Sequence, residues 1–179
     1  MSSGSFVVLT GASGAGKTTI ARSIEKLGLP NCEVHFFDSI GVPSVEQMRR
    51  EYGPEHEPGG AWQRAMTLDW VRRIRAILQC GTSVLFEGQM RIAFMKEALA
   101  ENEISGAHII LVDCDDTTRA ERLHVHRAQP DLANVDMMNW ARYLREEARA
   151  ADIRVLDTGR LSVAECVGAV VEQLHERRL

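Results

Sequence analysis

Eight residues near the amino terminus constrain the fold more than any other part of the chain. They run Gly-Ala-Ser-Gly-Ala-Gly-Lys-Thr from Gly11 to Thr18, which satisfies G-x-x-x-x-G-K-[ST] at every fixed position. A short apolar run, Phe6–Thr10, precedes them, and a helical pattern follows from Gly16 to Leu27. A strand, a glycine-rich loop and a helix in this order predict a phosphate-binding loop rather than a chance glycine turn.

The residue types of this loop suit the chemistry of a nucleoside triphosphate. Glycines let the backbone curl so that its N–H groups surround phosphate oxygens, and the following helix adds the positive end of its dipole. Lys17 can reach the β- and γ-phosphates, and the Thr18 hydroxyl can bind Mg²⁺. The sequence therefore predicts ATP and Mg²⁺ as cofactors. The residues predicted to bind the nucleotide are Gly11, Ala12, Ser13, Gly14, Ala15, Gly16, Lys17, Thr18 and Thr19.

Strand-like and helix-like patterns alternate along the whole chain. The further predicted strands are Val34–Phe37, Ser83–Phe86, Ala107–Val112 and Ile153–Leu156, which makes five with the first. The further predicted helices are Ala61–Cys80, Arg91–Ala100, Thr117–Ala128, Asp136–Ala151 and Ser162–Leu174. Such alternation predicts an α/β fold, with a parallel sheet covered by helices on both faces. The length of 179 residues suits one domain.

Composition excludes several classes of protein. A net charge of −4 leaves no basic footprint for nucleic acid, and no apolar run approaches the length of a membrane span. The start of the chain has no secretory pattern, and the four cysteines are scattered. We therefore expect a cytoplasmic protein with reduced, mostly buried thiols. The chain also lacks the Asn-Lys-x-Asp motif of GTPases, and large oligomeric ATPases usually have longer chains.

Four further motifs each follow a predicted strand. In chain order they are Asp38-Ser39, the run Glu87-Gly88-Gln89-Met90-Arg91, the arginine-rich run Arg119–Arg127, and Asp157-Thr158-Gly159-Arg160-Leu161-Ser162. The carboxyl ends of parallel strands meet at one edge of a sheet, where ligands of open α/β folds bind. Asp38 could alternatively cap a turn, and each arginine could be a solvated helix charge.

Together with the phosphate-binding loop, these motifs resemble the adenylate-kinase-like superfamily of P-loop kinases. That group includes nucleoside-monophosphate, shikimate and gluconate kinases and chloramphenicol phosphotransferase. The resemblance covers nearly the whole chain. It implies a five-stranded parallel sheet in the order 2-3-1-4-5 and a single kinase domain over residues 1–179. It also implies a substrate-binding insertion at about 40–80 and a small lid at about 119–142.

The resemblance implies roles for three residues on the acceptor side. Asp38 would orient or deprotonate the acceptor hydroxyl, as in the antibiotic phosphotransferase. Glu87 would be the Walker B acid, which holds Mg²⁺ through water close to the substrate. Arg91 would bind an anionic acceptor, by analogy with the Asp-Gly-x-x-Arg motif of adenylate kinase. Glu87 and Met90 depart from that motif, which has Asp and Pro at these positions.

The resemblance also implies roles around the nucleotide. Arg119 would pack on the adenine, and the loop containing Thr158 would lie against the same base. Arg127, just before the polar stretch 128–136, is the catalytic candidate of the lid, since lid arginines stabilise the charge on the transferring phosphoryl group. Arg142 and Arg145, on the helix leaving the lid, are further candidates.

The predicted function is ATP-dependent transfer of the γ-phosphoryl group to a small-molecule acceptor. Arg91 favours a nucleoside monophosphate, whereas Asp38-Ser39 favours a neutral hydroxyl, and we lean slightly towards the hydroxyl. The alternatives are a nucleoside-monophosphate kinase and an ATP-binding regulator with little or no transferase activity. A polynucleotide end-kinase fits the low charge poorly. The sequence predicts no nucleic acid or membrane partner and leaves the oligomeric state open.

Overall fold

A single five-stranded parallel sheet organises the molecule. The computed structural model describes residues 4–53, 59–126 and 129–176. All strand pairs are parallel, in the order β2-β3-β1-β4-β5, which confirms the predicted topology. The strands are β1 (Phe6–Thr10), β2 (Cys32–Phe36), β3 (Ser83–Glu87), β4 (His108–Asp113) and β5 (Arg154–Asp157).

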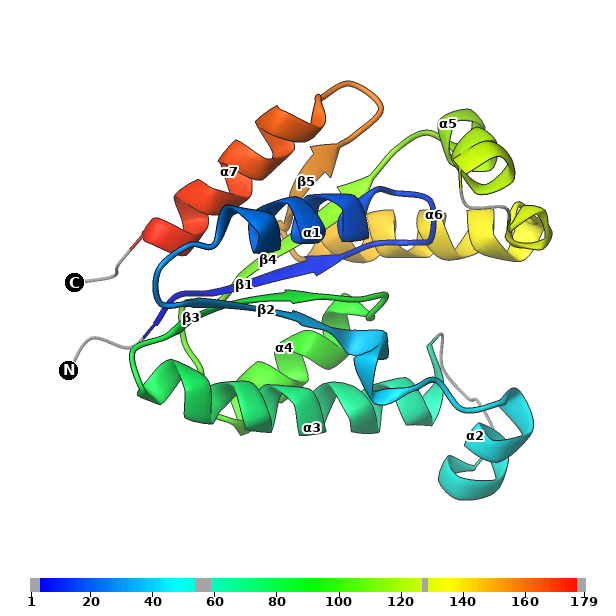
Figure 1. Cartoon of the computed structure of the whole chain (residues 1–179). Coiled ribbons are helices and arrows are strands. Elements are labelled where there is room, and N and C mark those ends of the chain that lie inside the picture. Colours follow the sequence, from blue (N-terminus) through cyan, green and yellow to red (C-terminus); the bar gives the residue numbers. More distant parts are fainter. Residues whose placement is uncertain (1–3, 54–58, 127–128, 177–179) are drawn as a thin grey trace.

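Helices cover both faces of this sheet (Figure 1). One face carries α1 (Lys17–Leu27) and α7 (Val163–His175). The other carries α3 (Gly60–Gln79), α4 (Ile92–Glu101) and α6 (Val135–Ala150). The remaining pieces lie at or beyond the carboxyl ends of the strands: η1 (Phe37–Ile40), α2 (Val45–Tyr52), α5 (Asp116–Glu121), the π-helical turn η2 (Arg122–His126) and η3 (Pro130–Leu132).

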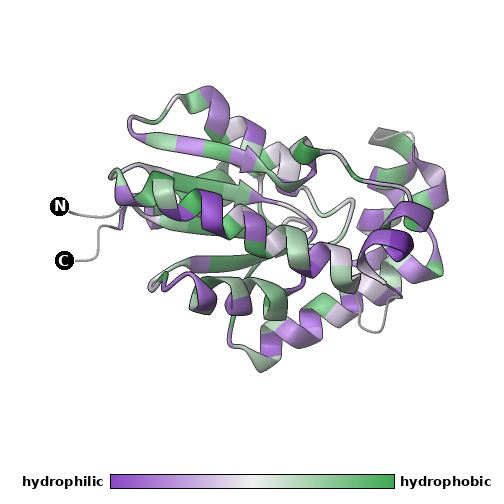
Figure 2. Ribbon diagram, turned by 90° about the horizontal axis from the view of Figure 1, so that it is seen from below, coloured by the Kyte–Doolittle hydropathy of each residue, from purple (hydrophilic) through white to green (hydrophobic). Residues whose placement is uncertain are grey.

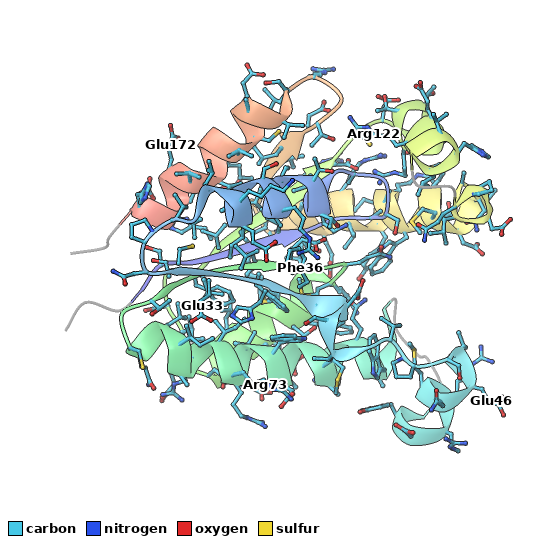
Figure 3. All side chains as sticks on the ribbon, viewed as in Figure 1. Glu33, Phe36, Glu46, Arg73, Arg122 and Glu172 are labelled. Carbon is cyan, nitrogen blue, oxygen red and sulfur yellow. The ribbon has the colours of Figure 1, made fainter. Side chains whose placement is uncertain are left out.

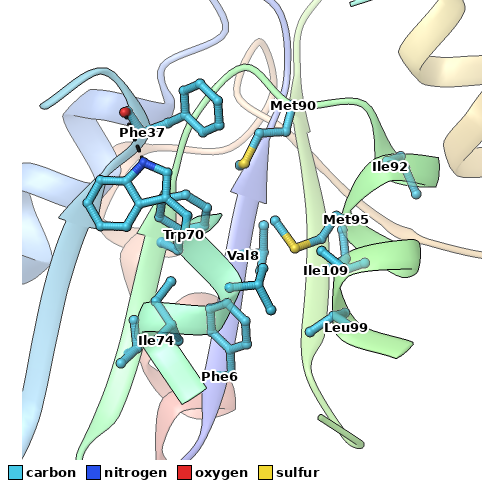
Figure 4. Packing of buried hydrophobic residues seen from close by; sticks show 14 of the residues in the cluster. Phe6, Val8, Phe37, Trp70, Ile74, Met90, Ile92, Met95, Leu99 and Ile109 are labelled. Atoms are coloured by element: carbon cyan, nitrogen blue, oxygen red, sulfur yellow. Dashed lines mark hydrogen bonds between the residues drawn. The ribbon is translucent and has the colours of Figure 1, made fainter. Parts of the chain in front are cut away.

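The sheet separates two apolar cores because the side chains of a strand alternate between its faces. Phe6 and Val8 of β1 face the α3 and α4 side, where Figure 4 shows them packed with residues such as Ile74 and Met95. Figure 2 shows that the hydrophobic residues are concentrated in the strands and that the helices mix both kinds. On this side the Trp70 indole N–H donates to the Phe37 carbonyl oxygen at 3.2 Å. The two cores hold the sheet rigid beneath the loops at its edge.

Capping residues explain where two of the helices begin. Ser162 and Glu165 form a capping box at the start of α7. Ser44 and Gln47 form an equivalent box at the start of α2, a helix that is not among those predicted from the sequence. The spacing of a serine and a glutamine three residues later was the available signal for α2.

The chain after β4 differs from the predicted helix Thr117–Ala128. The α-helix α5 ends at Glu121, and the π-helical turn η2 continues to His126. Such π turns are rare and often occur at functional sites. Residues 127–128, which include the lid candidate Arg127, lie outside the described residues.

The prediction of mostly buried cysteines was wrong for half of them: Cys114 and Cys166 are buried, Cys32 is partly exposed and Cys80 is exposed. Among the described residues, no helix is both long and apolar enough to cross a membrane.

Candidate active site

Glycines shape the loop between β1 and α1 by letting other backbone approach it. Gly11 has φ 150°, and a Cβ built there would lie 2.2 Å from the Val112 carbonyl oxygen of the neighbouring strand. Gly16, the residue before α1, has φ 96°, a left-handed conformation that L side chains rarely adopt. The backbone therefore requires glycine at both positions. This requirement fixes the two glycines of the G-x-x-x-x-G-K-[ST] pattern independently of any bound phosphate.

Three side chains form the polar centre under this loop. The Lys17 ammonium donates to the Ala12 carbonyl oxygen at 3.2 Å and lies 3.9 Å from Oε1 of Glu87. The Thr18 hydroxyl donates to the same Glu87 oxygen at 3.3 Å. Lys17 and Glu87 are only 6% and 7% exposed. A hydroxyl and a carboxylate facing each other are the hard oxygen ligands that Mg²⁺ prefers.

A pocket of about 410 Å³ opens beside the start of α1. Its polar lining comes from Gly16, Thr19, Arg122 and Thr158, and its apolar lining includes Leu161. Arg122 donates through its two terminal nitrogens to the Thr158 hydroxyl and carbonyl oxygens, each at 2.8 Å. The Thr158 hydroxyl donates in turn to the Ala15 carbonyl at 2.8 Å, so the loop after β5 is attached to the phosphate-binding loop. Figure 3 labels Arg122 beside the helical segment of α5 and η2, on the side of the loop that follows β5.

Arg119 does not occupy the place expected for an adenine-packing arginine. Its side chain is completely buried, pairs with Asp113 at the end of β4 and donates to the Ser13 carbonyl oxygen at 2.8 Å. The buried guanidinium therefore stabilises the phosphate-binding loop through its hydrogen bond to Ser13. Arg122, three residues later, lines the pocket instead. This corrects the expectation for Arg119, because a buried carboxylate draws that side chain inward.

Arg145 of α6 is held by the same acidic corner. It pairs with Asp113, and its terminal nitrogen lies 3.0 Å from Asp116. Burial lowers the pKa of Arg145, but the hydrogen bonds with the two carboxylates raise it more, so the side chain stays charged. These ion pairs of Arg145 attach α6 to the carboxyl end of β4.

Asp38 lies just after the carboxyl end of β2, the strand that pairs with β3. β2 pairs with β3 so that Phe36 is opposite Glu87, and Asp38 follows in the exposed turn η1. A Cβ built at Gly88 would lie 2.4 Å from the Phe37 Cβ, so glycine is needed for the two turns to approach this closely. Asp38 and Glu87 therefore emerge at the same edge of the sheet.

Arg91 is engaged by a glutamate that sequence reasoning did not single out. Its Nε donates to Oε1 of Glu147 at 2.8 Å, and its side chain is about one-fifth exposed. Glu147 also accepts the backbone N–H of Ile92 at 2.8 Å and so caps α4. The carboxylate comes from α6, 56 positions along the chain, and no local sequence signal links the two residues.

A second missed group joins the phosphate-binding loop to the predicted insertion. The Ser13 hydroxyl donates to the side-chain oxygen of Gln89 at 2.9 Å. Buried Gln63 of α3 donates to the Gln89 carbonyl at 2.8 Å and accepts the Arg91 backbone N–H at 2.9 Å. These bonds give the turn after β3 a defined shape between the two regions.

Comparison with known proteins agrees with this arrangement. A family model described as an AAA domain matches residues 7–131. The chain belongs to this family.

Solved structures with the same fold include several small-molecule kinases. A shikimate kinase from Acinetobacter baumannii in complex with shikimate has 18% identity and a TM-score of 0.58, over 98% of this chain and 95% of that chain. A gluconokinase from Sinorhizobium meliloti has 18% identity and a TM-score of 0.60, over 97% and 93%. A tunicamycin resistance protein from Deinococcus radiodurans has 19% identity and a TM-score of 0.64, over 96% of each chain. This chain shares its fold with these proteins, and its five-stranded parallel sheet has the order 2-3-1-4-5 that the resemblance implied.

Proposed function

We propose that this protein is an ATP-dependent phosphotransferase whose acceptor is the hydroxyl group of a small molecule. The main support is the cluster of Lys17, Thr18 and Glu87, which lies at the same sheet edge as Asp38. The names of the shikimate kinase and the gluconokinase with the same fold also favour a small-molecule kinase.

The proposed reaction is an in-line displacement. The acceptor oxygen forms a bond to the γ-phosphorus while the bond from that phosphorus to the β,γ-bridging oxygen breaks and ADP leaves with the electron pair. Asp38 accepts the hydroxyl proton. Lys17 stabilises negative charge on the β- and γ-phosphates, so most of the catalysis is positioning and electrostatics.

The residues around Glu87 fit a magnesium ion. Thr18 would be a direct ligand of the ion, and Glu87 would hold it through water. The bound ion would neutralise negative charge on the phosphates. Among the described residues, no group of three or more His, Cys, Asp or Glu side chains could hold a metal alone. A site completed by phosphate oxygens is therefore the form that suits this protein.

The pairing of Arg91 favours a hydroxyl acceptor over a monophosphate. An arginine that binds an acceptor phosphate must offer its charge, whereas here Glu147 already neutralises it at 2.8 Å. A monophosphate is also ionised at neutral pH and needs no base such as Asp38. We therefore place Arg91 in the wall of the acceptor site rather than on an acceptor phosphate.

The remaining roles that we propose, apart from that of Arg122, are those that the family resemblance implies. Residues 40–80 would bind the acceptor, residues 119–142 would form the lid, and Arg127 stays the predicted catalytic arginine of the lid. Arg122 and Thr158, which line the pocket beside α1, would contact the base. All these regions extend from one domain over residues 1–179.

Substitution of Asp38 tests the proposal directly. Asp38→Asn keeps the shape of the side chain but removes its charge and basicity. General-base catalysis contributes about 10²–10⁴-fold, so kcat should fall by that factor in a transfer assay with ATP and a panel of alcohols and monophosphates. The affinity for ATP should stay unchanged.

Arg91→Ala is the matched comparison. With a hydroxyl acceptor it should change kcat/KM only modestly. A large loss in Arg91→Ala with a mild effect of Asp38→Asn would instead favour a nucleoside-monophosphate kinase. Unchanged ATP turnover in both variants, with no acceptor found, would favour the regulator.

A further inference from the structure

Helix α6 carries two aromatic residues beyond the carboxyl edge of the sheet. Arg145 marks the level of that edge, because it pairs with Asp113 at the end of β4. Trp140 and Tyr143 precede Arg145 by five and two residues in α6, a helix whose amino-terminal part extends past the strands in Figure 1. Asp38 and Lys17 emerge at this same edge.

The two rings form a stacked pair. Their centroids are 5.5 Å apart and the angle between their planes is 9°. The Arg91 guanidinium lies 5.3 Å from the centre of the Tyr143 ring, on the turn that follows Glu87. Both rings pack against the apolar core but stay partly exposed, so they add a flat apolar surface to this edge.

The charges around the pair are balanced. Glu147 accepts from Arg91 Nε at 2.8 Å and from the Tyr143 hydroxyl at 3.3 Å. Burial, together with the charge of Glu147, raises the pKa of Tyr143, so the phenol stays neutral. A surface with paired charges and exposed ring faces suits an uncharged ligand better than an anion.

Trp140 also has an unsatisfied donor. Its indole N–H is shielded from solvent and has no hydrogen-bond partner within the described parts of the chain. A shielded N–H without an acceptor is unfavourable, and tryptophans in such places normally find a partner. A ligand oxygen reached by a small turn of the ring would satisfy it.

The segment after Asp38 is unusually apolar for an exposed region. Ile40, Val42 and Val45 are 38%, 56% and 55% exposed at the start of the predicted acceptor-binding insertion. Exposed apolar side chains gathered at one place indicate a binding surface. They extend from the same strand end as Asp38.

From these observations, and on the premise of the phosphotransferase function, we propose that Trp140 and Tyr143 receive the acceptor. The acceptor is an uncharged alcohol that carries an aromatic or heteroaromatic ring. Trp140 determines specificity by stacking on that ring, and Glu147 excludes anionic acceptors by neutralising Arg91.

Binding and transfer assays with matched probes test this proposal. The ring-bearing uncharged alcohols are thymidine, uridine and chloramphenicol. Thymidine monophosphate adds only charge to thymidine, and shikimate and gluconate are anionic alcohols without an aromatic ring. We expect binding and phosphorylation of at least one ring-bearing alcohol, and Trp140→Ala should weaken its binding about tenfold or more, the range of ring stacking. Trp140→Phe keeps the stacking and loses the N–H, so it should lie between wild type and Trp140→Ala.

Two controls separate a local effect from a general one. Glu146→Ala changes an exposed residue of the same helix and should bind the probes as wild type does. A non-hydrolysable ATP analogue should bind Trp140→Ala and Trp140→Phe with unchanged affinity, which also reports that both variants are folded. Glu147→Gln keeps an oxygen for the α4 cap and removes the charge, so it should shift preference from thymidine towards thymidine monophosphate about tenfold.

Failure of this inference differs from failure of the proposed function. Failure of all three ring-bearing alcohols to bind, equal affinity in wild type and Trp140→Ala, or an unshifted preference in Glu147→Gln would overturn the inference. Transfer to gluconate or shikimate that is insensitive to Trp140→Ala would overturn it too, while the phosphotransferase function would stand. The phosphotransferase function itself fails if no acceptor in the wider panel of alcohols and monophosphates is phosphorylated.

Discussion

The Thr18 hydroxyl oxygen lies 3.3 Å from Oε1 of Glu87. The two residues are 69 positions apart and meet because β1 and β3 are neighbours, with Leu9 of β1 opposite Glu87. The pairing of the strands thus delivers a carboxylate to the first turn of α1. Thr18 and Glu87 are thus brought together as the two residues that would hold a magnesium ion, Glu87 through water.

The charge of Glu87 should therefore control the dependence on magnesium. Glu87→Gln keeps the size of the side chain but removes its charge, and residues that hold a metal through water typically contribute about 10–100-fold to affinity or activity. We expect the Mg²⁺ concentration for half-maximal transfer to rise by about that factor in a magnesium titration. An unchanged titration would remove Glu87 from the metal site.

Lys17 should be essential for nucleotide binding. Lys17→Ala removes the positive charge expected on the β- and γ-phosphates, so transfer should be abolished and ATP binding strongly weakened. In a thermal-shift assay, Mg-ATP should stabilise the wild type, because ligand binding favours the folded state, and should barely stabilise the variant. Equal shifts would show that the phosphate-binding assignment is wrong. The melting temperatures without ligand serve as the reference for folding.

Arg119 and Arg122 should have separable roles although they lie three residues apart. Arg119→Met leaves Asp113 with Arg145 alone and should lower the free energy of unfolding by about 3 kcal/mol, the lower end for a broken buried pair. Arg122→Met should raise the Kd for an ATP analogue about tenfold and change the unfolding free energy by less than about 1 kcal/mol. Chemical denaturation and calorimetric titration measure the two effects. The reverse pattern would contradict the assignment of Arg122 to the pocket.

The cysteines should differ in reactivity with an alkylating reagent. Burial raises the pKa of the Cys166 thiol, and the charge of Glu165 adds to this, so little of it is thiolate at pH 7.5. Cys80 is exposed, and its labelling should be about tenfold or more faster than that of Cys166. Raising the pH should speed the labelling of Cys166, because its thiolate share grows towards the raised pKa.

ATP should slow the labelling of Cys166 further, since this residue lines the pocket beside α1. Cys80 serves as the internal reference in the same mass-spectrometric experiment. Labelling of Cys166 that is as fast as that of Cys80, or insensitive to ATP, would show that the adenine of ATP does not bind in the pocket beside α1.

Features that depend on local pattern were predictable from the sequence. The alternation of apolar runs and amphipathic segments gave the five strands to within two residues at each end, because backbone hydrogen bonding and side-chain periodicity act over a few neighbours. The phosphate-binding loop was predictable for the same reason, since its glycines are required by positive φ angles of the loop's own backbone. The strand order followed from the family resemblance, and α2 was missed although its capping box was present.

Features that depend on distant partners were decided only by the tertiary structure. Arg119 and Arg122 look alike in the sequence, but the carboxylate of Asp113 buries one of them and leaves the other at the pocket. Arg91 resembles an anion-binding arginine until α6 brings Glu147 against it. The reason is physical: the chain sets which charges exist, whereas packing sets which opposite charge each one meets and how much water separates them.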